Sequence, residues 1–213
     1  MTPDPETQNN PPAGCAPVSI YTARLELRPL SISDAEDLHL ILGDPLVTKY
    51  LDLPTSESLN QTRQFLAQWL YVLPEWHATW SIVHLQSRRV IGIVNYHHRE
   101  IWNERLEIGY FLAQACWGRG FATEAVEALI SHCFRSLGVH RIEATIEPEN
   151  IAAQKLAHRL GFIKESQTLR HRRKVGGTYR DEIMFGLLSQ AGNPEKSEQP
   201  ATGNATEGGI CRV

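Results

Sequence analysis

The sequence predicts a single domain of the α/β (α+β) class, with a mixed, mostly antiparallel seven-stranded sheet flanked by about four helices. Two observations predict this class. Three runs of alternating polarity follow one another with short polar loops between them, as in an antiparallel meander. Later in the chain, a helix pattern separates two strand-like runs, which introduces a parallel step into the sheet.

The first half of the domain supplies four of the strands and two of the helices. Residues 24–30 alternate in polarity and predict the first strand. Ser33 and Glu36 have the spacing of a capping box, so we expect a helix from there to about Leu42. Residues 58–73 carry apolar side chains at helical spacing, and Pro74 stops that helix. The meander then covers residues 79–85, 90–97 and 104–113.

The second half supplies three strands and two helices. Apolar residues at helical spacing predict a helix after residue 120 that ends at Gly138, and residues 140–147 alternate as a strand. A helix over residues 151–160 is closed by Gly161. Runs at 162–170 and 179–188 predict the last two strands, and the Gly176-Gly177 pair between them indicates a hairpin.

Composition limits the environment and the partners. The chain has 213 residues, 42% of them hydrophobic, which is enough for one sizeable core. Its formal net charge of −3 provides no positive field for DNA or a membrane surface. There is no apolar run of about 18 residues, and the polar N-terminus predicts no targeting signal. The four cysteines lie far apart, which favours a reduced, cytoplasmic protein.

Both ends of the chain differ in composition from the middle. Residues 1–18 and 191–213 are rich in Pro, Asn, Thr and Gly and carry few apolar side chains. We expect them to be disordered tails. The folded domain is therefore expected to span residues 19–190.

A glycine-rich loop lies between a predicted strand and the most regular helix pattern of the chain. Gly118 and Gly120 let backbone N–H groups approach a ligand without interference from a Cβ atom. The helix N-terminus behind them adds unpaired N–H groups and a partial positive charge. This arrangement predicts a site for a phosphate ester. It is not a P-loop, because no Lys-Ser/Thr follows the second glycine.

The loop and three other motifs resemble those of a known family. Residues 117–125, Trp-Gly-Arg-Gly-Phe-Ala-Thr-Glu-Ala, resemble the acyl-CoA loop of the GNAT N-acetyltransferases. Residues 150–162 resemble that family's Asn-led helix ending in Leu-Gly-Phe. The strand at 24–30 and the Glu107-Ile-Gly-Tyr run are similar to the RimJ/RimL-like branch, the ribosomal-protein alanine N-acetyltransferases. The resemblance covers about residues 20–190 and implies the GNAT fold.

The resemblance implies that the protein is an acyltransferase with acetyl-CoA as co-substrate. The pyrophosphate would lie at the glycine loop, and the pantetheine arm along the preceding strand. The residues that match the family's cofactor site are Phe111, Leu112, Trp117, Gly118, Arg119, Gly120, Phe121, Ala122, Thr123 and Asn150. Asn150 is expected to cap its helix. By its place in the family pattern it is also a candidate catalytic residue, through a contact with the cofactor arm or with a water near the thioester.

Glu107 is the candidate general base, by its place in the family pattern. Among apolar neighbours, desolvation would raise its pKa, which suits a base. The alternative is a strand carboxylate that faces solvent or pairs with Arg105. A general acid is missing, because Ala153 and Ala157 occupy its usual places in the family. His158 is expected on the surface, and Tyr110 is expected to pack.

Three further groups invite a chemical interpretation. Cys116 lies beside the glycine loop, but no base neighbours it in sequence, so we expect direct transfer without an acyl-cysteine. His97 and His98 suggest a metal site, yet adjacent strand residues point to opposite faces, so we expect no metal. The basic run at 170–174 is interpreted as a solvated hairpin edge, with an RNA contact as the alternative.

The acceptor is the part of the reaction that the sequence leaves open. The first reading is a primary amine, such as a protein N-terminal α-amine. The alternatives are a small-molecule amine (an amino acid, polyamine or amino-sugar) and a catalytically weak acyl-CoA-binding module. The acceptor site is expected to be built by residues 43–60, Trp69 and the hairpin near Tyr179. Carboxylates of Asp44, Asp52 or Glu57 would make it acidic and suit a cationic amine. Trp76, Trp80 and Trp102 are expected to pack. A homodimer is compatible with the sequence.

Overall fold

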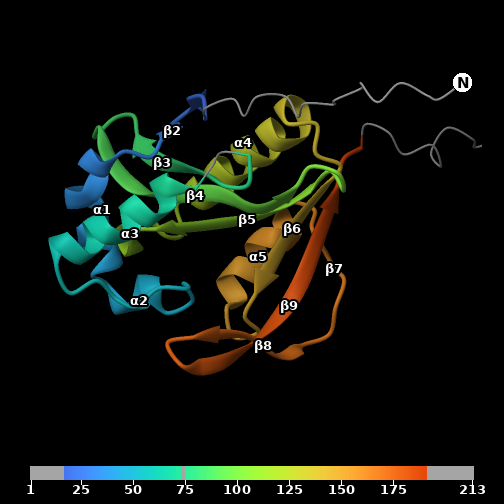
Figure 1. The fold of residues 1–213 in the computed structure, drawn as a ribbon. Coiled ribbons are helices and arrows are strands. Elements are labelled where there is room, and N and C mark those ends of the chain that lie inside the picture. Colours follow the sequence, from blue (N-terminus) through green and yellow to red (C-terminus); the bar gives the residue numbers. More distant parts are fainter. Residues whose placement is uncertain (1–16, 73–74, 191–213) are drawn as a thin grey trace, which may run out of the picture.

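A curved sheet with one parallel step forms the centre of the molecule (Figure 1). The computed structural model describes residues 17–72 and 75–190, which contain nine strands. These are β1 (Ile20–Tyr21), β2 (Leu25–Pro29), β3 (Ala78–His84), β4 (Arg89–Glu100), β5 (Arg105–Leu112), β6 (Arg141–Ile146), β7 (Ile163–Lys164), β8 (Leu169–Val175) and β9 (Thr178–Leu188). Their order is β1-β2-β3-β4-β5-β6-β9-β7, with β8 paired to β9. Among these pairs only β5 and β6 run parallel.

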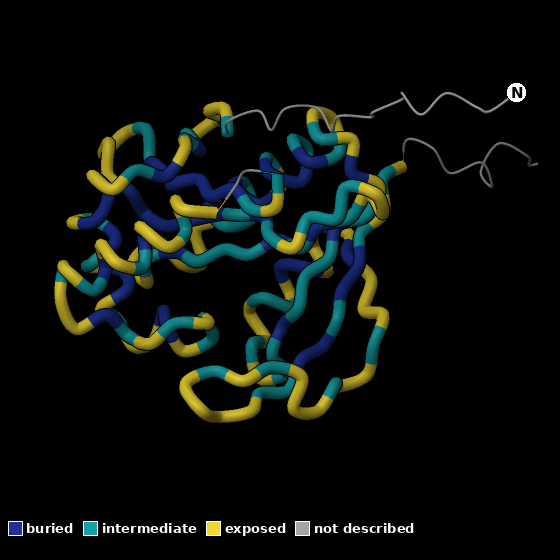
Figure 2. The backbone as a smooth tube through the Cα atoms, viewed as in Figure 1, coloured by how far each residue is buried: buried dark blue, intermediate teal, exposed yellow. Residues whose placement is uncertain are grey.

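Helices cover both faces of the sheet and enclose two apolar clusters. They are α1 (Ala35–Leu42), α2 (Pro45–Thr48), α3 (Leu59–Tyr71), α4 (Phe121–Ser136) and α5 (Ile151–Arg159). One cluster joins the sheet to α4 and α5, and the other joins its opposite face to α1 and α3. Figure 2 shows the central strands and the inward side of α4 as buried, whereas the β8–β9 turn is exposed. Of the helices in the described segments, none is long and apolar enough to cross a membrane.

The expected mixed α/β fold is confirmed, but the described residues contain nine strands and five α-helices where seven strands and about four helices were expected. Strands β1 and β7 have only two residues each, too few to give an alternating pattern, and α2 has four. The two tails predicted from composition lie, apart from residues 17 and 18, outside the described residues. Pro74, the predicted helix stop, is also outside them, and α3 ends before it at Tyr71.

Two local expectations were wrong. The capping box uses Ser31 and Asp34 and opens a short 3-10 helix, because Asp34 is fixed there by Arg28 and by the Ser31 N–H. The segment expected as one strand at 162–170 instead contains the short strand β7 and the start of a separate strand, β8. The basic run at 170–174 lies within β8. The Gly176-Gly177 hairpin turn is confirmed, and both glycines have positive φ angles.

The sheet opens between its two parallel strands, as Figure 1 shows. The register of β5 with β6 covers three pairs and ends at Glu107 opposite Glu143. Beyond that point β6 continues against β9, while β5 continues against β4 as far as Leu112. Among the described residues, no strand pairs with the β6-facing edge of β5 from residue 108 onward. This opening positions the site described below.

Candidate active site

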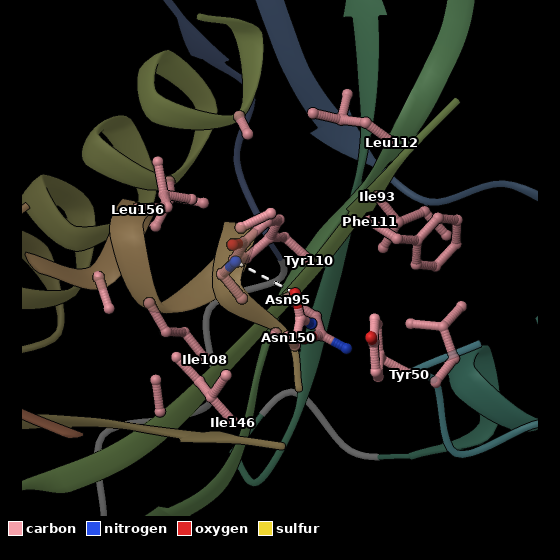
Figure 3. A pocket seen from close by; sticks show the side chains of 18 of the residues that line it. Tyr50, Ile93, Asn95, Ile108, Tyr110, Phe111, Leu112, Ile146, Asn150 and Leu156 are labelled. Carbon is pink, nitrogen blue, oxygen red and sulfur yellow. Dashed lines mark hydrogen bonds between the residues drawn. The ribbon is translucent and has the colours of Figure 1, made fainter. Parts of the chain in front are cut away.

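A pocket of about 650 Å³ occupies the opening between β5 and β6. It extends from the glycine loop and α5 to the segment after α2 and the β8–β9 hairpin. Figure 3 shows Asn95, Asn150 and Tyr50 near its centre, with apolar side chains on either side of them. Its size falls in the range of sites for small molecules and cofactors.

The glycine loop forms one end of this pocket. Gly118 has a φ of 70° and Gly120 a φ of 79°, a left-handed conformation that L side chains rarely adopt. A Cβ added to Gly118 would meet nothing within 4 Å, so its backbone faces open space. The indole N–H of Trp117 donates to the Leu112 carbonyl at 2.9 Å and ties the loop to the end of β5. The loop thus presents backbone N–H groups at the N-terminus of α4.

The N-terminal strands support this loop from behind. Glu124, in the first turn of α4, accepts hydrogen bonds from the Thr22 hydroxyl at 2.6 Å and the Arg24 guanidinium at 2.7 Å. The Arg24 guanidinium also donates to the Arg119 carbonyl at 3.1 Å and lies over the Phe121 ring. Burial opposes ionisation of Glu124, but these bonds outweigh it and lower its pKa. The loop conformation therefore depends on residues about 100 positions away.

Most of the predicted cofactor residues line the pocket, and one does not. The lining includes Phe111, Leu112, Trp117, Gly118, Gly120, Phe121, Ala122, Thr123 and Asn150. Arg119 is outside the lining, and its guanidinium lies over the Phe121 ring. Asn150 caps α5, as expected, and its Oδ1 accepts from the Ala153 N–H at 3.1 Å, the dashed line in Figure 3. Sequence reasoning missed Arg159, which lines the pocket and donates to the Thr123 hydroxyl at 3.2 Å.

Glu107 lies where the two parallel strands separate, and its carboxylate bridges them. The Thr145 N–H donates to Glu107 Oε1 at 3.2 Å, and the Thr145 hydroxyl donates to the same oxygen. Burial opposes the charged form, but the bonds from Thr145 and the nearby imidazoles outweigh it, so the pKa of Glu107 is lowered. The expectation of a raised pKa was therefore wrong. Glu107 is a pocket-lining carboxylate that is ionised at neutral pH.

The two adjacent histidines lie on the same side of the sheet, contrary to expectation. The β4–β5 register shifts between His97 and Glu100, and His98 has a φ of 49°. This bulge turns the His98 ring onto that of His97, with ring centroids 4.7 Å apart and planes at 11°. His98 Nδ1 lies 3.3 Å from Glu107 Oε2. The argument from strand alternation fails here because the strand is locally irregular.

An ionic network joins the other end of the pocket to the hairpin. Arg173 on β8 pairs with Asp52, with Glu147 at 3.2 Å and with Glu182 at 3.0 Å. Arg180 on β9 also pairs with Glu147, at 2.7 Å. Burial raises the pKa of Glu182, while Arg173 acts in the opposite direction. The network holds the segment after α2 against the hairpin.

Of the other residues expected at the acceptor end, some line the pocket and others do not. Trp69 and Asp52 line the pocket. Asp44 instead caps α2, accepting from the Leu46 N–H at 2.9 Å, and Glu57 and Tyr179 are outside the lining. None of the tryptophans expected to pack lines the pocket, but only one of them is buried in the core: Trp80 is buried, whereas Trp76 and Trp102 are exposed.

The candidate proton donors have distinct positions. Ala153 and Ala157 line the pocket and have nothing to donate. His158 is exposed, as expected, with its ring against Phe185. Tyr110 packs on the core and also lines the pocket, and burial raises the pKa of its hydroxyl. Burial also raises the pKa of Cys116, which disfavours the thiolate that an acyl-cysteine would require.

Comparison with known proteins agrees with this fold and this loop. The family model described as the acetyltransferase (GNAT) domain matches residues 24–163. The chain is 39% identical over 173 residues to the uncharacterized N-acetyltransferase p20 of Bacillus licheniformis, covering 81% of this chain and 97% of that protein. It is 33% identical over 99 residues to the ribosomal-protein-serine acetyltransferase of Escherichia coli, covering 46% of this chain and 55% of that protein.

A solved structure shows the same fold. The RimL ribosomal L7/L12 α-N-protein acetyltransferase in complex with coenzyme A superposes with a TM-score of 0.71 at 23% identity, covering 80% of this chain and 98% of that chain. The chain belongs to the GNAT acetyltransferase family and is an acetyl-CoA-dependent acyltransferase. Its relatives include ribosomal-protein acetyltransferases, as the motifs indicated.

Proposed function

We propose that this enzyme transfers the acetyl group of acetyl-CoA directly to a protein N-terminal α-amine, with Glu107 as general base. One observation carries the proposal: the Glu107 carboxylate, held by Thr145, lines the same pocket as the glycine loop. The activity is assigned to the cytoplasm, where acetyl-CoA and new protein N-termini occur together. The relative from Escherichia coli named for a ribosomal-protein serine supports a protein acceptor.

The donor end binds through the backbone. The N–H groups around Gly118 and Gly120 would hold the pyrophosphate at the N-terminus of α4, and Arg159 adds a positive charge on the pocket lining. The unpaired edge of β5 from residue 108 onward would bond the pantetheine arm as an added strand would. Phe111, Leu112 and Asn150 line this path.

The acceptor end works through side chains. An amine entering between the segment after α2 and the hairpin would meet the Glu107 carboxylate, which attracts its positive charge. A carboxylate with a lowered pKa is a weak base toward a free ammonium group. It can still accept a proton from the more acidic nitrogen of the tetrahedral adduct, directly or through water. The departing CoA thiolate is a tolerable leaving group near the N-terminus of α4, so the transfer needs no dedicated acid. Tyr110 lines the pocket, but its raised pKa makes it a poor proton donor.

The acceptor is tested by a thiol-release assay with a matched panel. The protein is incubated with acetyl-CoA and either a peptide with a free N-terminal Ala or Ser, the same peptide with a blocked N-terminus, spermidine, an amino acid, or an amino-sugar. We expect acceptor-dependent thiol release with the free peptides and an acetyl group on the α-nitrogen by fragmentation mass spectrometry. Turnover with the small amines alone would contradict a protein acceptor and would assign a small-molecule amine in its place. Tight CoA binding with no turnover on any amine would indicate a binding module.

A further inference from the structure

We propose that His97, His98 and Glu107 form a binding site for a zinc-class divalent cation, and that a bound cation blocks the acceptor end of the pocket. One ligand atom from each of the three side chains lies within 4.8 Å of the other two. Two imidazoles and one carboxylate are ligands that zinc binds readily. In this role the metal is an inhibitor, and the transfer reaction does not require it.

The bulge in β4 creates the site. In a regular strand, the side chains of residues 97 and 98 would lie on opposite faces of the sheet. The positive φ of His98 and the shift in register place both rings on one side, stacked at 4.7 Å. The pairing of His97 with Glu107 across β4 and β5 brings the carboxylate to the same place.

Hydrogen bonding orients two of the ligands. His97 Nδ1 lies 3.0 Å from the Glu107 carbonyl oxygen. Because a carbonyl only accepts, Nδ1 carries the hydrogen, and the lone pair of His97 is on Nε2. Histidines that bind metals commonly donate their second ring nitrogen to a carbonyl in this way. Thr145 fixes Glu107 Oε1, which leaves Oε2 facing His98.

The distances require only a small closure around the metal. Zinc bonds of about 2.0–2.1 Å in a tetrahedron separate the ligand atoms by about 3.4 Å. His98 Nδ1 and Glu107 Oε2 are already 3.3 Å apart. The His98 side chain is 78% exposed, so it is free to adjust and accessible to ions from solvent. His97 and Glu107 also line the pocket, so a cation held by them would lie at its wall.

Occupancy has a consequence for the reaction. A cation bound to Glu107 would remove the carboxylate that meets the incoming amine and repel a cationic acceptor. This consequence rests on the proposed function, whereas the binding of zinc does not. Inhibition should therefore be competitive with the amine and not with acetyl-CoA. Magnesium should not substitute, because it prefers octahedral oxygen ligands.

The test measures zinc binding by titration calorimetry on the full chain after removal of metal by chelation. We expect one zinc ion per chain, and His98→Asn should weaken binding at least tenfold. Asn tolerates the positive φ at this position, so the variant keeps the backbone of the bulge. The matched control is His158→Asn, an exposed histidine outside the cluster, which should bind zinc as the parent does. Cobalt should give a spectrum without thiolate charge transfer, which separates this site from the cysteines.

The outcomes separate the site from its role. Absence of zinc binding, or equal binding by His98→Asn and the parent, would overturn the site whatever the activity. Zinc inhibition is measured in parallel as a fraction of each variant's own rate. His98→Asn should require at least tenfold more zinc than the parent for the same fractional inhibition. Zinc bound at this site without inhibition would overturn the blocking role and would count against Glu107 as the group that meets the amine.

Discussion

The two ends of the pocket are built by different means. The donor end consists mainly of backbone from one continuous segment, held in place by glycine conformations and a helix N-terminus. The acceptor end consists of side chains from β4, β5, β6, β8 and the segment after α2, which meet only in the folded chain. A site made of local backbone changes little with side-chain substitution, whereas one made of distant side chains can vary. This difference explains why the donor was identifiable and the acceptor was not.

Substitution of Gly120 by Val should have the largest effect on the donor end. The φ of 79° strains any L residue by about 1–2 kcal/mol, and a Cβ would lie 3.4 Å from the Arg24 guanidinium. We expect the dissociation constant of acetyl-CoA, measured by calorimetry, to rise at least tenfold. Gly138→Val is the matched control, because Gly138 has a φ of 65° with open space around it and lies outside the pocket lining. Equal losses of affinity in both variants would refute a local role for the loop.

Substitution in the ionic network at the acceptor end should have the next largest effect. Arg173→Gln leaves the buried Glu182 carboxylate and Glu147 without a shared cation, which should destabilise the fold by about 2 kcal/mol. It should also raise the KM for the amine several-fold while the acetyl-CoA dissociation constant is unchanged. Arg170→Gln, at an exposed position in the same strand, is the control. A change in acetyl-CoA affinity alone would contradict the division between the two ends.

The support behind the glycine loop should give the smallest effect. The pKa of Glu124 is lowered in the folded chain, so its contribution to stability is present above its unfolded pKa and disappears as pH falls through its folded pKa. Glu124→Gln should therefore lower the melting temperature at pH 7 by a few degrees, corresponding to about 1 kcal/mol.

The pH dependence provides the control for this prediction. The difference in melting temperature between Glu124→Gln and the parent should shrink as pH falls from the unfolded pKa of Glu124 through its folded pKa. Thermal melting from pH 7 downward measures it. Glu127→Gln, an exposed carboxylate on the same helix, should show no such pattern. A constant difference at all pH values would mean that ionisation of Glu124 is not what stabilises the loop.

Much of the fold and the donor end could be predicted because the signals are local. Alternation defined most strands, and the glycines and Asn150 act on their own neighbours in sequence. The His97–His98 bulge was not predictable, because no glycine or proline marks it. The ionic network was equally hidden, since Arg173 and Asp52 are far apart in sequence and only the fold pairs them. Arg159 had a weak signal, a cation in the last turn of the helix that Asn150 begins.

The central claim is that Glu107 acts on the amine while the loop holds the donor. Its most direct test is the turnover and the acetyl-CoA affinity of Glu107→Gln, measured on one preparation. We predict that kcat falls about 100-fold or more, because general bases contribute effects of that order, while the acetyl-CoA dissociation constant is unchanged. Turnover equal to that of the parent, or a parallel loss of acetyl-CoA binding, would contradict this account.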